Sequence, residues 1–231
     1  MERRRFLESC AAVTGAASLG ALEGAWANAT PRSYPRARLG DDRGTPLRAR
    51  AVAAQTNYVF HYPYASTPCF LLNLGRPLTA ASTLTREDGT RYAWGGGVGP
   101  TRSIVAFSAI CAHKLAYPAR EVSFIRYQAA KTPTADAGVI HCCADHSVYD
   151  PAGGARVVSG PAPQPLAAIM LDYDAAADEL WAIGTLGAEQ FDAFFRKYEF
   201  KLALEYGNGK ANAPIGDRAV VRELAEFCRN T

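Results

Sequence analysis

Two short clusters of cysteine and histidine most constrain what this 231-residue chain can fold into. The first is Cys111-Ala112-His113, and the second is Cys142-Cys143-Ala144-Asp145-His146. The chain has four histidines, so two such clusters within one stretch are its least random feature. Thiolates and imidazoles are ligands that suit iron and zinc. The sequence therefore predicts a fold that brings two loops together around a metal centre.

The N-terminus has the features of an export signal. The segment Arg3–Leu7 precedes a small-residue apolar run, Ser9–Leu22, and an A-x-A site at Ala27-Asn28-Ala29. A basic start, a short apolar run and such a site are typical of a cleaved signal. The Arg-Arg-x-Phe-Leu pattern resembles a twin-arginine signal, which a receptor reads as an address. We expect residues 1–29 to be this signal and the protein to be periplasmic.

Retention of the signal as a membrane anchor is the less favoured alternative. The apolar run is short and consists mostly of Ala, Gly, Ser and Thr, whereas a spanning helix needs about 20 predominantly apolar residues. The formal net charge is +3. Because this bias is small and aromatic residues do not alternate with a basic patch, nucleic acid is not expected as a partner. A membrane is expected only through a complex or an uncleaved signal.

The middle of the chain has the pattern of a mainly β protein. Short runs rich in Val, Ile, Tyr and Phe recur between turn signals such as Asp41–Gly44 and Asp88-Gly89. The predicted strands cover residues 57–62, 69–72, 91–94, 103–108, 122–127, 139–140, 156–158, 167–172 and 179–183. The preceding segment, residues 30–49, is predicted to be a linker followed by a first strand.

The C-terminal part has helical rather than β periodicity. One helix is predicted between Ala188 and Tyr206, and a second would begin at an Asp217 N-cap. Their apolar faces would be Phe191, Phe194, Phe195, Tyr198 and Leu202 in the first helix, and Val220, Val221, Leu224, Phe227 and Cys228 in the second. The predicted organisation is thus a β domain at 50–186 and a C-terminal helical extension at 187–231.

The second cluster and the sequence after it resemble a known family. The segment His146–Gly154, followed by Gly160-Pro161-Ala162-Pro163, resembles the second cluster-binding loop and the Pro loop of Rieske iron–sulfur proteins. Cys111-Ala112-His113 resembles their first loop. The resemblance implies an antiparallel β-sandwich or open barrel with cluster loops at 110–118 and 141–165. It also implies one [2Fe–2S] cluster per chain.

The resemblance implies a ligand set of Cys111, His113, Cys143 and His146. In Rieske centres two His replace two Cys on one iron, which raises the potential to roughly −150 to +300 mV. Counting back without a gap from Tyr149-Asp150 would instead place the thiolate on Cys142 and an imidazole at residue 145, where an Asp stands. The Cys-x-x-His spacing favours Cys143, and Cys142 stays the alternative.

Neighbouring residues both support and qualify the resemblance. Tyr149 resembles the family tyrosine that donates to a ligand sulfur, and Ser147 resembles the serine that donates to a bridging sulfide. Many quinol-oxidising members have an extra Cys in each loop, and these positions correspond here to Ala116 and Asp145. The insert between the loops is also long. Both departures weigh against a straightforward respiratory quinol-oxidising role.

The implied function is that of an exported electron-transfer subunit, not catalytic alone. It would pass single electrons between a quinol or a redox-enzyme partner and a cytochrome or copper protein. Rieske subunits of cytochrome bc-type complexes and of arsenite oxidase are similar in this way, and the latter also has a twin-arginine signal. The expected partners are therefore a cytochrome, a copper protein or a catalytic subunit, with quinol as a further candidate.

Two other functions are considered. A Rieske component of an oxygenase system would need a mononuclear iron held by two His and a carboxylate, and only His61 and His141 remain outside the predicted ligands. A structural zinc site could use two Cys and two His, but its usual spacing is Cys-x2–4-Cys followed by His-x3–5-His. Cys69 and Cys228 are expected to be buried free thiols rather than a disulfide.

Overall fold

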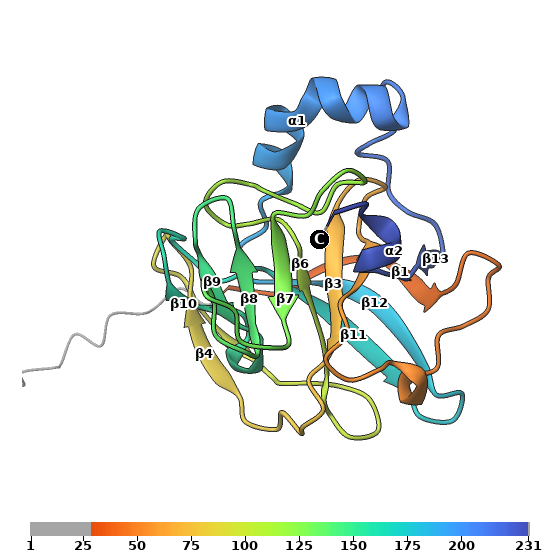
Figure 1. Ribbon diagram of the computed structural model, residues 1–231. Helices are drawn as coiled ribbons and strands as arrows, with labels where there is room; N and C mark the ends of the chain where they lie inside the picture. Colours follow the sequence, from red (N-terminus) through yellow and green to blue (C-terminus); the bar gives the residue numbers. More distant parts are fainter. Residues whose placement is uncertain (1–28, 231) are drawn as a thin grey trace, which may run out of the picture.

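The computed structural model describes residues 29–230 (Figure 1). The predicted signal at 1–29 therefore lies, apart from Ala29, outside the described residues. Within the described range, no helix has the length and apolar character needed to cross a membrane.

The chain is built mainly from short strands, so the predicted mainly β class is confirmed. The strands are β1 (Arg32–Gly40), β2 (Tyr58–His61), β3 (Pro68–Asn73), β4 (Ser82–Thr85), β5 (Arg91–Trp94), β6 (Ile104–Ser108), β7 (Ile125–Gln128), β8 (Val139–Cys142), β9 (Val148–Asp150), β10 (Arg156–Ser159), β11 (Ala168–Asp174), β12 (Glu179–Leu186), β13 (Arg218–Val220) and β14 (Arg222–Glu223). The helical elements are α1 (Phe191–Tyr206), α2 (Leu224–Phe227) and the 3₁₀ turns η1 (Ala49–Ala51) and η2 (Pro151–Gly153).

The largest sheet is nearly closed on itself. Its eight strands follow the order β13-β1-β12-β11-β6-β3-β2-β14. β13 pairs in parallel with β1, β14 pairs antiparallel with β2, and Val221 separates the two strands in the chain. Because consecutive strands join the two ends of the strand order, the sheet must curl until its ends are neighbours. Residues 218–223 thereby join the two sides of an open barrel.

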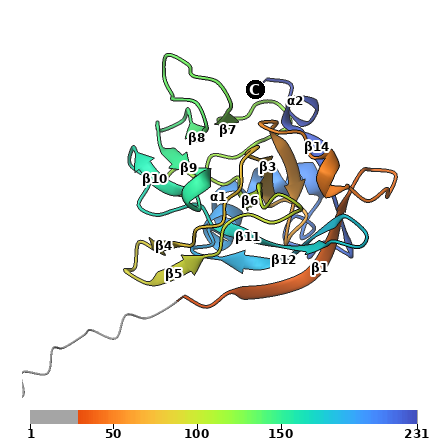
Figure 2. The same ribbon diagram turned by 90° about the horizontal axis from the view of Figure 1, so that it is seen from below.

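A smaller four-stranded sheet, in the order β10-β9-β8-β7, lies to one side of the large sheet (Figure 2). The hairpin β4–β5 forms a third, two-stranded sheet. A shared core joins the three sheets, because Phe107 of β6, Trp94 of β5, and Ile140 and Tyr149 of the small sheet are buried in one apolar cluster. The end of β6 and the end of β8 are thus fixed against the same core.

Helix α1 stands outside the sheets and packs against the segment that follows β6 (Figure 1). Phe191, Phe194 and Leu202 of α1 are buried in a cluster with Ile110 and Tyr117. Phe195 and Tyr198 are partly buried against the same cluster, so the predicted apolar face of this helix packs inward.

The helix predicted to begin at Asp217 differs in the structure. The Asp217 carbonyl accepts a hydrogen bond from the Arg38 N–H, Val220 lies in β13, and helix begins only at Leu224. Pairing with the edges of the large sheet thus outweighs local helical periodicity. The segment 187–231, predicted as a helical extension, also supplies two strands to the main sheet.

Candidate metal centre

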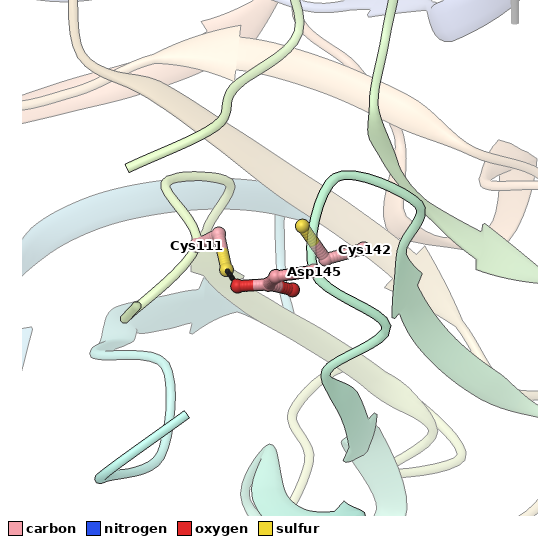
Figure 3. Close-up of side chains that lie close together, drawn as sticks. All are labelled: Cys111, Cys142 and Asp145. Carbon is pink, nitrogen blue, oxygen red and sulfur yellow. Dashed lines mark hydrogen bonds between the residues drawn. The ribbon is translucent and has the colours of Figure 1, made fainter. Parts of the chain in front are cut away.

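Two cysteines from distant parts of the chain meet at the junction of the sheets. Cys111 follows β6, and Cys142 is the last residue of β8. One ligand atom from each of these cysteines and one from Asp145 lie within 4.8 Å of one another (Figure 3). Both cysteines are buried in the core cluster shared by the sheets. This is the set of Cys, His, Asp and Glu side chains, among the described residues, whose geometry could hold a metal ion.

The first loop is a tight backbone ring that begins at Cys111. The Cys111 N–H donates to the carbonyl of Ala116 at 2.8 Å, and the Leu115 N–H donates to the carbonyl of Cys111 at 3.0 Å. Leu115 has a left-handed backbone, with φ of 57°. These two hydrogen bonds and this turn residue fix the loop without a disulfide.

The second loop repeats this pattern from Cys142. The Cys142 N–H donates to the carbonyl of Ser147 at 2.9 Å, and the His146 N–H donates to the carbonyl of Cys142 at 2.8 Å. His146 is left-handed, with φ of 61°. Residues at the same distance along each loop therefore have the same backbone role, and Cys142 corresponds to Cys111.

Asp145 is the most buried carboxylate of the site, with a side chain only 2% exposed. One carboxylate oxygen accepts hydrogen bonds from Cys111 Sγ at 3.2 Å and from His113 Nδ1 at 3.0 Å. The other accepts from the Ser147 N–H at 2.9 Å. Burial raises the pKa of Asp145, but hydrogen bonds from the Ser147 N–H, Cys142 and Cys111 outweigh it and lower the pKa to about 2. The carboxylate is therefore held ionised inside the site.

The tyrosine predicted to donate to a ligand sulfur lies against Cys111. Tyr149 is fully buried, and its hydroxyl lies 3.3 Å from Cys111 Sγ. That hydroxyl also accepts a hydrogen bond from the Ala112 N–H at 3.1 Å, which leaves its own proton for the sulfur. Hydrogen bonds, the strongest from Cys142 and a further one from Tyr149, outweigh the opposing effect of burial and lower the pKa of the Cys111 thiol to about 7. The hydrogen bond between the two cysteines raises the pKa of Cys142.

The four ligands predicted from the sequence do not all meet. Cys111 lies in the site, and His113 contacts it through Asp145. Cys143 is exposed, and its Sγ lies 3.8 Å from His141 Nδ1. His146 is exposed, and its ring stacks on that of His141 with centroids 5.9 Å apart. The gapless count back from Tyr149-Asp150 is the sequence signal that points to Cys142 and residue 145.

Among the described residues, two further cysteines and the histidine of β2 do not belong to this group of possible ligands. Cys69 and Cys228 are buried free thiols, as expected. His61 packs against Phe227 with ring centroids 5.6 Å apart. Burial, together with the charges of Arg120 and Arg222, lowers its pKa to about 4. His61 is thus a half-buried packing side chain.

The Pro loop is packed directly onto the second loop. Gly160 has φ of 89°, and a Cβ at this position would lie 2.5 Å from the Ser147 Cα and 2.6 Å from the His146 carbonyl oxygen. Only glycine combines this backbone conformation with such a close approach. The Pro loop, which the sequence identifies by its resemblance to Rieske proteins, thus contacts the second loop at residues 146–147.

No family model matches the chain. It is 27% identical over 191 residues to the iodate reductase subunit IdrB of Denitromonas iodatirespirans, covering 81% of this chain and 82% of that protein. Among solved structures, it matches the soluble domain of the Rieske protein II (soxF) from Sulfolobus acidocaldarius. That match has 28% sequence identity, a TM-score of 0.48, and coverage of 66% of this chain and 78% of the other. That solved structure is by title a Rieske protein, the family that the loop motifs resemble.

Proposed function

We propose that this chain is an exported electron-transfer subunit that carries a Rieske-type [2Fe–2S] cluster. It would pass single electrons between a quinol or a redox-enzyme partner and a cytochrome or copper protein. The observation that carries the proposal is the buried pair Cys111 and Cys142, which two separate loops bring together beside Tyr149.

The side chains around this pair fit an iron–sulfur group. Thiolates are the ligands that hold such clusters, and Cys111 already has a lowered pKa. Among the described residues, the buried Ser147 hydroxyl has no hydrogen-bond partner. A buried hydroxyl without a partner is costly, and a sulfide at the site would supply an acceptor. When bound, such a cluster supplies a one-electron carrier.

A catalytic redox subunit is the partner that we favour. The relative from Denitromonas is by name a subunit of an iodate reductase, so a complex with an oxidoreductase subunit is the simplest assignment for this chain. His113 supplies a route to such a partner, since its side chain is 35% exposed while Nδ1 faces the buried Asp145. Electrons would therefore leave at the surface beside the first loop.

Export to the periplasm by the twin-arginine route is part of the proposal. Its support is the Arg3-Arg4-Arg5-Phe6-Leu7 sequence and the short apolar run after it. Replacement of Arg3 and Arg4 by Lys should keep the full chain in the cytoplasmic fraction. Export of that variant at the normal level would contradict the proposed route.

The cluster is tested on the purified protein reduced with dithionite. We expect about two irons and two sulfides per chain, the composition of a [2Fe–2S] cluster, and a rhombic EPR signal from the reduced state. The Cys111→Ser and Cys142→Ser variants would lose most of the iron, whereas Cys69→Ser would keep it. Zinc in place of iron, or a reduced protein without an EPR signal, would refute the proposal.

A further inference from the structure

We propose that the cluster ligands are Cys111, His113, Cys142 and Asp145, so that a carboxylate takes the place of one of the two imidazoles. This inference rests on the proposed function and names the four residues that would bind the cluster. It replaces the set predicted from the sequence, in which Cys143 and His146 were the ligands of the second loop.

The choice of thiolate follows from the equivalence of the two loops. Each loop opens with a Cys whose N–H donates to the carbonyl five residues later and whose carbonyl accepts from the N–H four residues later. Cys111 has this role in the first loop, and Cys142 has it in the second. Cys142 is also fully buried beside Cys111, whereas Cys143 is exposed and contacts His141. Cys142 is therefore the second thiolate.

The same equivalence removes His146 from the ligand set. His146 occupies the left-handed position of its loop, and the matching residue of the first loop is Leu115, which cannot bind a metal. The His146 ring stacks on His141 at the exposed side of the loop. His146 thus has the role of a turn residue.

Asp145 stands where an outer ligand is needed. It is the third residue after Cys142, which keeps the Cys-x-x-ligand interval. One oxygen of its carboxylate lies 3.2 Å from Cys111 Sγ and 3.0 Å from His113 Nδ1, so it contacts two residues of the first loop. Buried carboxylates are normally paired or bound to a metal, and carboxylate is an established ligand of non-haem iron.

This ligand set changes the charge of the site. An imidazole is neutral, whereas the Asp145 carboxylate adds one negative charge next to an iron. The reduced state, which gains an electron, becomes harder to reach. The potential should therefore be lower than it would be with His at residue 145.

The wild-type protein labelled with ¹⁵N-histidine gives the most direct test. Pulsed EPR of the reduced cluster counts the imidazole nitrogens bound to iron. We expect one strongly coupled nitrogen, from His113, and its loss in His113→Ala. Two strongly coupled nitrogens in the wild-type protein would overturn the assignment, while the proposed electron-transfer function would stand.

Variants of the second loop give an independent test. Cys143→Ser and His146→Ala should keep the iron content and the EPR signal, and Cys142→Ser should lose them. Asp145→His should keep the cluster, add a second coupled nitrogen and raise the potential. Asp145→Ala should lose most of the iron; circular dichroism would check that both Asp145 variants are folded.

The outcomes separate this assignment from the proposed function. Loss of the cluster in His146→Ala or Cys143→Ser, with retention in Cys142→Ser, would refute the ligand assignment alone. Retention of a full cluster and unchanged potential in both Asp145 variants would also refute it. A wild-type protein without iron and sulfide would refute the proposed function and, with it, this inference.

Discussion

At the scale of single residues, Tyr149 is the neutral side chain best placed to set how readily the site accepts an electron. Its hydroxyl is held by the Ala112 N–H and reaches Cys111 Sγ inside the core. A hydrogen bond to a thiolate disperses negative charge and stabilises the reduced state more than the oxidised state. Such polar contacts around a metal centre tune its potential.

Tyr149→Phe removes this donor and keeps the ring. A hydrogen bond to a charged group contributes roughly 1.5–3 kcal/mol, and a tenfold change for one electron corresponds to about 59 mV. We expect the potential to fall by up to roughly 65–130 mV with the iron content unchanged. Redox titration followed by EPR would measure it. Tyr173→Phe is the control, because the Tyr173 hydroxyl donates to Asp178 instead of to a cysteine of the site. An equal shift in both variants would contradict the role of Tyr149.

Sequence motifs could predict part of the site at this scale. The loop motifs predict Cys111, His113 and Tyr149. In the structure Tyr149 contacts Cys111 directly, and His113 is linked to Cys111 through Asp145. Spacing could not decide between Cys142 and Cys143, because the Cys-x-x-His interval favours Cys143 and the gapless count from Tyr149 favours Cys142. The choice depends on which thiol faces the core, and that is determined by the pairing of β8 with β7 and β9.

At the scale of elements, the site depends on a contact between two loops that are separate in sequence. Gly160, at the start of the Pro loop, lies on the backbone of residues 146–147. This close approach of the two backbones supports the second loop at residues 146–147. The Pro residues that follow, Pro161 and Pro163, restrict the backbone of the supporting loop.

Gly160→Ala should therefore destabilise the site. The positive φ alone costs about 1–3 kcal/mol for a residue with a side chain, and the Cβ would also meet the Ser147 Cα at 2.5 Å. Gly89→Ala is a matched control, since φ is 81° there and no atom lies within 4 Å of the Cβ. We expect a clearly larger loss of unfolding free energy and of bound iron for Gly160→Ala. Equal losses in chemical denaturation would contradict the loop contact.

At this scale, the sequence predicts an element correctly when its conformation depends on neighbouring residues and not on partners distant in the chain. The strand signals at 69–72, 103–108 and 179–183 are confirmed by β3, β6 and β12. The turn at Asp88-Gly89 joins β4 and β5, as its local chemistry predicts. The helix from Asp217 was wrong, because the partners of residues 218–223 are β1 and β2 at the other end of the chain.

At the scale of the whole molecule, the last residues complete the fold. β13 and β14 join opposite sides of the large sheet, and α2 adds Leu224 and Phe227 to the core cluster that also contains Cys111 and Cys142. The C-terminal segment is thus connected to the metal centre through packing.

Leu224→Ala tests this connection. Leu224 is 2% exposed, and a buried Leu→Ala substitution costs about 2–5 kcal/mol. Leu204→Ala is the matched control, because Leu204 is 73% exposed on α1 and surface changes usually stay within about 0.5 kcal/mol. Urea denaturation should show a lower midpoint for Leu224→Ala alone. Equal midpoints for the two variants would show that the C-terminal segment does not stabilise the barrel.

Closure of the large sheet also limits how this protein can associate with others. In the described part of the chain, the ends of its strand order are β13 and β14, which span three and two residues. Short edge strands offer few free backbone groups to an incoming strand, which disfavours aggregation. Strand addition to this sheet is therefore a poor means of partner recognition. A protein that docks on this sheet would therefore have to recognise side chains rather than a free strand edge.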